Sequence, residues 1–595
     1  MARRPVSSGG LRDKLRKLAF ERGGLVILVI AGVYAALTPT YIVDGENAEF
    51  STLSVLGGAA HPSGYPLYVL WLRVWAWLPG ASAAHTAGLA TALLGVAACA
   101  VLHAACRAWG ARPLAASLAT AMFAAAPVVL RLHTEAEVFA MNNLVLALVL
   151  WLAAERGPVR GTARAVLLAL VAGLGLCNHL TCALIAPVGI LGVVRGVREA
   201  AAAPRAIALA VAALLAGLAP YAYLLVAPST PISWGQAGSL GDMIAFITRR
   251  DYGGPFAFAA EPGTTIDVVA NLGAFVRTLG RGWLWLPGLL GVGVLGLHCV
   301  RAPDGGEPRR GWQLLAVSWL VAGPILVARF NIAPEGLGLL VCQRFYLVPL
   351  LLLAVPVALG LERVLAAVDR QVPDALGAAM ATALFVALAG VALPQHRAIA
   401  SRSVEAGTLN LLRSLPPNAV VISRTDLRSA ADYAQSVLGV RPDVVLVAWR
   451  MVPLRWYRDR LAARGVTFDA SAGGDAPLSL TVAEAVLATG RPLFVDLALG
   501  NVLQSYTTYP HGIVFRVLPH GATQLSLDEI VALNKELYAA FDLDYPHPGP
   551  DDGHPVGIHD KYAATWAILA KALADTGRAR EAHDAAELAR ELAPR

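Results

Sequence analysis

Three acidic residues lie within six positions, directly after the first long apolar segment of the chain: Asp44, Glu46 and Glu49. Carboxylates this close to one another, at a membrane boundary, repel each other and lose hydration. Such a site favours a raised pKa, a bound metal or a cationic partner. A carboxylate held there could act as a general base on an acceptor hydroxyl. A solvated loop whose acids only cap the following helix is an alternative of about equal weight.

Side chains suited to phosphate binding or to lining a pocket recur in the other connections between apolar segments. Arginine binds phosphate through charge-assisted hydrogen bonds. A lone histidine at a helix end is more often structural, and a pair of arginines at an interface can simply anchor a helix. The predicted phosphate-binding residues are His61, Arg131, His179, Arg249, Arg250 and Arg344, and the predicted pocket residues are Tyr65, Glu137, Asn178 and Trp234.

Apolar segments must position these residues, because 56% of the 595 residues are hydrophobic and only 15% are charged. This composition is typical of a membrane protein, in which each helix needs about 20 apolar residues to cross the bilayer. The sequence predicts eleven spans, at 24–41, 83–105, 113–130, 138–154, 165–180, 182–194, 206–226, 282–300, 312–329, 345–361 and 375–394.

Charge indicates which way the chain threads the membrane. Seven basic residues precede the first apolar segment, in a predicted cytoplasmic N-terminus at 1–23, and alternate connections carry most of the remaining arginines. The net charge of +7 is therefore interpreted as a topology signal, not as a nucleic-acid surface. The acidic loop and the predicted site residues then share the outer face, as does everything after the eleventh span.

The sequence becomes more polar after about Pro394, which predicts a second domain. AVVISR at 419–424, DVVLVAW at 443–449 and PLFVDLAL at 492–499 are typical of short buried strands separated by helices. The segment after about Tyr562 resembles one tetratricopeptide-type hairpin, although two amphipathic helices that cap the domain are the simpler interpretation. The predicted domains are a transmembrane domain at 24–394, an extracytoplasmic α/β domain at 395–540 and a helical segment at 541–595.

Several of these motifs, in this order and through roughly residues 25–515, resemble one family of membrane glycosyltransferases. They are HPSGYP, EAEVFAMNNL, GLGLCNHLT, PISWGQ, TRRDYGG, QRFYLVP and RPDVVLV. The family is glycosyltransferase family 117, which includes the animal plexin-type protein O-mannosyltransferase. HPSGYP, which begins twelve residues after Glu49, is the most distinctive motif.

The resemblance implies a mainly helical GT-C type fold whose first outer loop carries the catalytic acid. It implies a sugar donor linked to polyprenyl phosphate and transfer to a protein or glycan acceptor hydroxyl on the extracytoplasmic face. The family pattern of an Asp, two residues and a Glu falls on Glu46 and Glu49. Because Glu replaces the expected Asp at 46, Asp44 is kept as a further catalytic candidate.

Two other classes of protein remain as alternatives: a polytopic transporter or lipid flippase, and a membrane-anchored binding protein. The one-sided clustering of polar residues argues against a transporter, whose charges recur at the bilayer midplane. A divalent metal would suit so many carboxylates, but no spacing requires one. We expect a bacterial inner membrane protein whose partners are a lipid-linked donor, an acceptor and membrane lipid.

Overall fold

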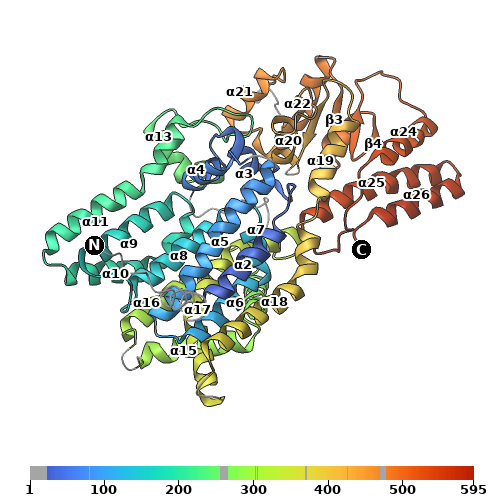
Figure 1. The fold of residues 1–595 in the computed structure, drawn as a ribbon. Coiled ribbons are helices and arrows are strands. Elements are labelled where there is room, and N and C mark those ends of the chain that lie inside the picture. The colour runs from blue at the N-terminus through green and yellow to red at the C-terminus, as the bar shows by residue number, and fades with distance from the viewer. Residues whose placement is uncertain are drawn as a thin grey trace, which may run out of the picture.

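The computed structural model describes residues 23–78, 81–254, 265–301, 303, 306–368, 372–424, 427–469 and 477–595. The predicted basic N-terminus, apart from residue 23, and part of the long connection at 227–280 lie outside these residues. Helices pack side by side through the first two thirds of the chain, and a smaller mixed region sits at one end of them (Figure 1). We call this smaller region, from α19 (Ser403–Ser414) to α26 (Ala579–Leu592), the C-terminal region. The end of the membrane helices next to it is called the domain side.

The membrane part consists of helices joined by short breaks. Its α-helices are α2 (Gly24–Leu37), α3 (Gly45–Leu56), α4 (Pro66–Trp75), α5 (Ala83–Ala108), α6 (Pro113–Ala125), α7 (Pro127–Thr134), α8 (Phe139–Ala153), α9 (Gly161–Leu176), α10 (Ala186–Glu199), α11 (Ala203–Gly217), α12 (Tyr223–Val226), α13 (Leu240–Ile247), α14 (Val268–Gly282), α15 (Leu286–Val300), α16 (Arg309–Leu320), α17 (Gly336–Val368) and α18 (Asp374–Ile399). Shorter turns are η2 (Leu180–Ile185), η3 (Ala219–Ala222), η4 (Arg250–Tyr252) and the π-turn η5 (Val321–Ile325).

The predicted number of eleven spans is not confirmed. Within the described ranges, five helices are long and apolar enough to cross a membrane, or up to seven if each of two bent pairs counts as one span. Every predicted span overlaps a helix, but several of these helices have only 12–16 residues. Proline and glycine at the breaks explain the difference, because they interrupt the backbone hydrogen bonds without interrupting the apolar sequence. The pair α6 and α7, broken before Pro127, bends by 70°.

Two segments of the chain, the first connection and α17, differ from the expectation in ways that affect the site. The first connection is not an open loop but contains α3 and α4, because Asp44 caps α3 and Pro66 occupies the first turn of α4. Helix α17 begins at Gly336, nine residues before the predicted span at 345. Arg344 therefore lies two turns inside a helix and not in a connection between helices.

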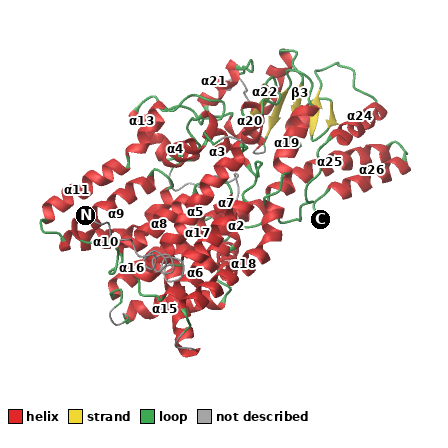
Figure 2. Cartoon of the chain, viewed as in Figure 1, coloured by secondary structure: helices red, strands yellow, loops and turns green. Residues whose placement is uncertain are grey.

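The C-terminal region is an α/β unit followed by two long helices, as predicted, and Figure 2 places its strands together at the end far from α11. The order β2-β1-β3-β5-β4 has β1, β2 and β3 parallel, with β5 and β4 added antiparallel. The β4–β5 hairpin was not predicted. The elements are α19 (Ser403–Ser414), β1 (Val420–Ser423), α20 (Leu427–Ser436), β2 (Val445–Ala448), η6 (Trp449–Met451), α21 (Arg455–Ala463), α22 (Leu478–Ala488), β3 (Leu493–Val495), α23 (Gly500–Ser505), β4 (Thr508–His511), β5 (Val514–Val517), α24 (Leu527–Ala540), α25 (His554–Asp575) and α26 (Ala579–Leu592).

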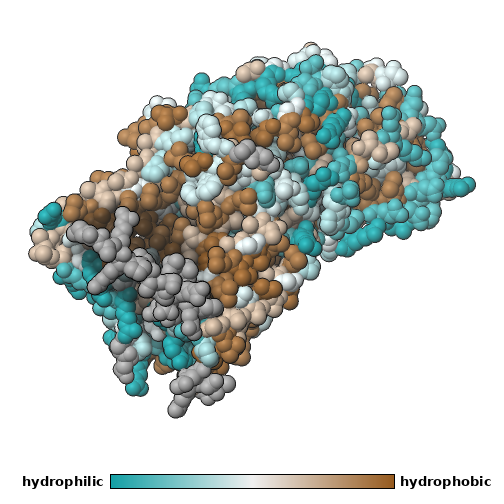
Figure 3. Space-filling model, viewed as in Figure 1, coloured by the Kyte–Doolittle hydropathy of each residue, from teal (hydrophilic) through white to brown (hydrophobic). Residues whose placement is uncertain are grey.

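Apolar burial joins the two parts into one body. The main core lies among the membrane helices, while Ile42, Ala48 and Ala84 of the membrane part belong to the core of the C-terminal region. Figure 3 shows apolar side chains gathered over the membrane helices and hydrophilic ones over the far end of the C-terminal region. Exposed apolar residues such as Leu215 and Leu289 are expected on helices whose outer surface faces lipid.

Candidate functional site

One guanidinium on α17 gathers three of the predicted acidic residues. Arg344 Nη1 lies 2.5 Å from Glu46 Oε1, and its Nη2 lies 3.4 Å from Asp44 Oδ2 and 3.3 Å from Glu137 Oε1. Arg344, Asp44 and Glu137 are buried, whereas 36% of the Glu46 side chain is exposed. Glu46 is therefore the carboxylate of this group that a substrate can reach.

Asp44 has a structural duty beside its contact with Arg344. Its Oδ1 accepts a hydrogen bond of 2.7 Å from the backbone N–H of Asn47, so it caps α3. The alternative that an acid of this loop caps the next helix is therefore correct for Asp44. It is not correct that the loop is solvated, because eight consecutive residues of α3, from 47 to 54, are buried.

Charge contacts determine the protonation of Glu46 and His61. Burial raises the pKa of Glu46, but the charges of Arg344 and His61, together with hydrogen bonds from Arg344 and Glu137, outweigh burial and lower that pKa to about 2. Burial lowers the pKa of His61, but attraction and hydrogen bonding to Glu49, helped by Glu46, outweigh burial and raise it. At neutral pH Glu46 is thus ionised, and His61 keeps more of its proton than an ordinary histidine does.

Glu49 and His61 form a second pair beside the first. His61 Nδ1 lies 2.6 Å from Glu49 Oε2, and the His61 backbone N–H donates to Glu49 Oε1 at 2.8 Å. Both oxygens of Glu49 are therefore engaged, and the carboxylate is buried. The Tyr65 hydroxyl lies 3.2 Å from His61 Nε2, which fixes the other side of the ring.

Aromatic rings surround this pair and bring further predicted residues to the same place. The Tyr65 ring stacks on His179 with ring centroids 5.7 Å apart, and the Trp234 ring lies 6.5 Å from that of His61. His179 also caps η2 by accepting from the Thr181 backbone N–H. Asn178 donates to the Val138 carbonyl at 3.1 Å, so it ties the start of η2 to α8.

The predicted phosphate-binding arginines do not all gather here. Arg249 acts on Tyr65 through its charge. Burial and the negative charge of Glu46 raise the pKa of the Tyr65 hydroxyl, and the positive charge of Arg249 partly offsets this rise. Its guanidinium also stacks on Tyr252, 5.2 Å from the ring centroid. Arg250 is exposed, and Arg131 contacts Glu135 and the Leu340 carbonyl instead of the first-loop acids.

The C-terminal region supplies residues to this neighbourhood that sequence reasoning missed. His554, at the start of α25, has its Nε2 4.0 Å from Asp44 Oδ2. Arg428 on α20 donates to the Pro231 and Ile232 carbonyls, directly before Trp234. Nothing in the local sequence marks these residues, because each acquires its neighbour only when chain segments hundreds of residues apart pack together.

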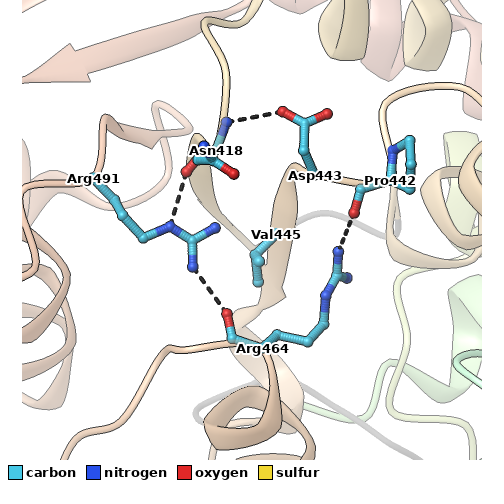
Figure 4. Close-up of a pocket in the computed structure, with 6 residues that line it drawn as sticks. All are labelled: Asn418, Pro442, Asp443, Val445, Arg464 and Arg491. Carbon is cyan, nitrogen blue, oxygen red and sulfur yellow. Dashed lines mark hydrogen bonds between the residues drawn. The ribbon is translucent and has the colours of Figure 1, made fainter.

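A metal centre and a pocket in the C-terminal region are the two other kinds of site that the fold could offer. Within the described ranges, no three His, Cys, Asp or Glu side chains are placed so as to hold a metal ion. An open cavity of about 450 Å³ lies in the C-terminal region, away from Glu46 (Figure 4). Its Arg464 donates to the Pro442 carbonyl, and its Arg491 donates to the carbonyls of Asn418 and Arg464, so these arginines hold loops together.

The chain is similar in sequence to known proteins. The family model described as the N-terminal domain of protein O-mannosyl-transferase TMEM260 matches residues 47–201, which include Glu49, HPSGYP and His179. The chain is 26% identical over 489 residues to protein O-mannosyl-transferase TMEM260 of Mus musculus, covering 77% of this chain and 65% of the relative. It is 21% identical to the Dictyostelium discoideum protein of the same name, covering 72% of this chain and 57% of the relative. The chain thus spans less than two thirds of either relative.

The fold is similar to solved structures. ArnT from Cupriavidus metallidurans, in a crystal structure bound to undecaprenyl phosphate, superposes with a TM-score of 0.52 at 15% identity, over 84% of this chain and 99% of ArnT. The apo structure of ArnT gives the same TM-score at 14% identity. The predicted GT-C type fold and the predicted resemblance are confirmed, and the chain is an integral membrane protein.

Proposed function

We propose that the chain is a membrane glycosyltransferase that moves a sugar from a polyprenyl-phosphate donor to an acceptor hydroxyl. The observation that carries the proposal is the ion pair between an accessible carboxylate, Glu46, and a buried guanidinium, Arg344, beside the Glu49–His61 pair. The likeness to ArnT supports a polyprenyl-phosphate donor. The names of the relatives support mannose as the sugar and a protein as the acceptor.

The reaction needs a base, a nucleophile and a stabilised leaving group. Glu46 takes the proton of the acceptor hydroxyl, whose oxygen forms a bond to the anomeric carbon as the bond from that carbon to the phosphate oxygen breaks. The phosphate leaves with the electron pair of the broken bond. Arg344, with Arg249 and His179 nearby, offers positive charge and hydrogen bonds to the departing anion. Both oxygens of Glu49 are already engaged by His61, so Glu49 orients His61 and, through it, Tyr65.

The proposal includes the orientation of the chain in the membrane. The arginines of alternate connections favour a cytoplasmic N-terminus, which would put Glu46 and the C-terminal region outside the cytoplasm of a bacterial inner membrane. In this proposal the membrane domain contains the catalytic residues, and the C-terminal region limits the access of acceptors to them. The transporter alternative is not favoured, because the relatives are named protein O-mannosyl-transferases.

The test is transfer from polyprenyl-phosphate mannose to a peptide with free hydroxyls, measured as release of polyprenyl phosphate by the purified protein. Glu46→Gln and Glu49→Gln should each lower the rate at least about a hundredfold, the range for loss of a general base or of its positioning. Glu335→Gln makes the same change at an exposed position and should leave the rate unchanged. Wild-type rates in both Glu46→Gln and Glu49→Gln would refute the assignment.

A further inference from the structure

A second polar cavity, of about 50 Å³, lies on the domain side of the membrane helices. Four helices form its walls: α7, α14, α17 and α18. The polar side chains that line it are Arg131, Thr278, Arg281, Gln343, Gln395 and His396. None of these six carries a negative charge, and the rest of the lining is apolar, so the charge that the cavity presents is positive.

Arg131 is the buried cation of this cavity, with 4% of its surface exposed. Its Nη2 lies 3.4 Å from the Leu340 carbonyl oxygen, and its Nη1 lies 3.9 Å from Glu135 Oε2, which is too far for a hydrogen bond. Burial also raises the pKa of Glu135 to about 8 despite the attraction of Arg131, so this acid is mostly neutral at pH 7. A buried guanidinium is costly unless an anion pairs with it, and Glu135 does so poorly.

His396 is an independent indication that the cavity binds a ligand, because it is buried and only one of its two ring nitrogens lies near a hydrogen-bond partner. Its Nε2 lies 3.5 Å from the Leu37 carbonyl oxygen, and its Nδ1 has no hydrogen-bond partner within the described part of the chain. A buried ring nitrogen without a partner is uncommon. An anion in the cavity would favour the charged imidazole, which donates from both nitrogens.

The cavity is a neighbour of the Glu46 site and not part of it. Glu135 is close to both, since it lies 3.9 Å from Arg131 and its pKa also responds to the charges of Asp44 and Arg344. Gln343 and Arg344 are consecutive on α17, and consecutive helical residues point about 100° apart. The lining residues of α18, from 392 to 399, occupy the last two turns of that helix, next to the C-terminal region, so the cavity lies near the ends of the membrane helices and not at their middle.

We propose that this cavity binds the phosphate group of an anionic lipid at a site distinct from the catalytic one. Arg131 and Arg281 supply the charge, and Thr278, Gln343, Gln395 and His396 supply hydrogen bonds to phosphate oxygens. Free inorganic phosphate has the same chemistry and is the other source of the ligand. The inference goes beyond the proposed transfer reaction, since it concerns binding without turnover.

The experiment is a titration of the purified full-length protein in a neutral detergent, with dioctanoyl phosphatidylglycerol in one series and inorganic phosphate in another. Arg281→Gln removes an exposed lining charge and should raise the dissociation constant about tenfold, as expected for the loss of a charge-assisted hydrogen bond. Arg277→Gln is the matched control, because Arg277 is exposed on the same helix one turn earlier and does not line the cavity. It should bind like wild type.

Each outcome decides one point. Tighter binding of phosphatidylglycerol than of phosphate identifies a lipid head-group site, and equal binding identifies a phosphate site. The absence of saturable binding by either probe, or an equal loss in Arg281→Gln and Arg277→Gln, would overturn the proposal. Glu46→Gln should bind both probes normally even though it abolishes transfer. A matching loss of binding in that variant would mean that the ligand occupies the carboxylate site.

Discussion

A single guanidinium neutralises a group of carboxylates that could not otherwise be buried together. Arg344 contacts Asp44, Glu46 and Glu137, and like charges this close would resist burial without it. In the proposed reaction the donor phosphate competes for the same guanidinium. As Arg344 turns toward phosphate, the pKa of Glu46 rises from about 2 and the carboxylate becomes a stronger base. Donor binding would thus prepare the base for the acceptor.

The Glu49–His61 pair makes stability depend on pH. The pKa of His61 is raised above its ordinary value of 6.5 in the folded protein, mainly because Glu49 outweighs the effect of burial. Its contribution to stability is therefore fully present below about pH 6.5 and is lost as the pH rises through the raised pKa. The melting temperature in detergent should fall over that window.

Glu49→Gln should flatten this part of the profile, since the neutral amide no longer favours the charged imidazole. Melting curves of the wild type and the variant between about pH 5 and 9 measure the effect. Glu335→Gln should keep the wild-type slope. An unchanged slope in Glu49→Gln would show that His61 is not the group that titrates.

At the scale of elements, the HPSGYP turn fixes where His61 and Tyr65 lie. Gly64 has a φ of 90° and Tyr65 a φ of 44°, a left-handed conformation that a non-glycine residue adopts only at a cost. Pro66 then starts α4 with the backbone angle that a helix requires. The strain at Tyr65 is maintained because its ring is stacked on His179 and its hydroxyl is close to His61.

Gly64→Ala tests the turn. A Cβ at this position would meet Leu224 side-chain carbons at 3.0 Å in a conformation that alanine disfavours. We expect a loss of about 1–3 kcal/mol in stability and a lower transfer rate, because Tyr65 must move. Gly293→Ala on α15 is the control: its Cβ would meet no atom within 4 Å, and alanine suits a helix interior. Equal melting temperatures for Gly64→Ala and wild type would contradict the role of the turn.

At the scale of the whole molecule, the C-terminal region is docked onto the first connection. The Ile42 backbone N–H donates to Glu405 at 3.2 Å, and Ala48 of α3 lies in the core of the C-terminal region. The Trp456 ring lies 5.7 Å from Trp234, which itself approaches His61. The acidic helix α3 is thus held by the C-terminal region and, through Asp44 and Glu46, by Arg344 of α17.

Arg428→Ala tests this docking. The change removes the hydrogen bonds to the Pro231 and Ile232 carbonyls from a buried guanidinium, so two carbonyls lose a charged donor at about 1.5–3 kcal/mol each. Hydrogen exchange of the 230–236 segment and of α3 should become faster, and transfer should slow. Arg413→Ala alters an exposed arginine of the same region and should change neither. Unchanged exchange in Arg428→Ala would mean that the apolar contacts alone hold the interface.

Local patterns predicted the elements of this protein well, because each depends on residues close in the sequence. Each predicted apolar run overlaps a helix, and the three predicted strand segments coincide with β1, β2 and β3, whereas α3, α4, α13 and most of α14 lie in segments that were predicted to be connections. The helix breaks were harder to predict, as at Pro127, since a broken helix keeps the same apolar composition as a continuous one. For this reason the number of spans could not be read from hydrophobicity.

The sequence alone determined that the chain enters a membrane, carries an acidic first connection and continues into an α/β unit. Only the tertiary structure decided which carboxylate meets which cation. Arg344 and Asp44 are 300 positions apart, and the contact between them depends on where the fold places α17 relative to the start of α3. Arg131, which looked equivalent to Arg344, instead faces a separate cavity. The physical reason is that long-range electrostatic partners are chosen by packing geometry, which no local pattern encodes.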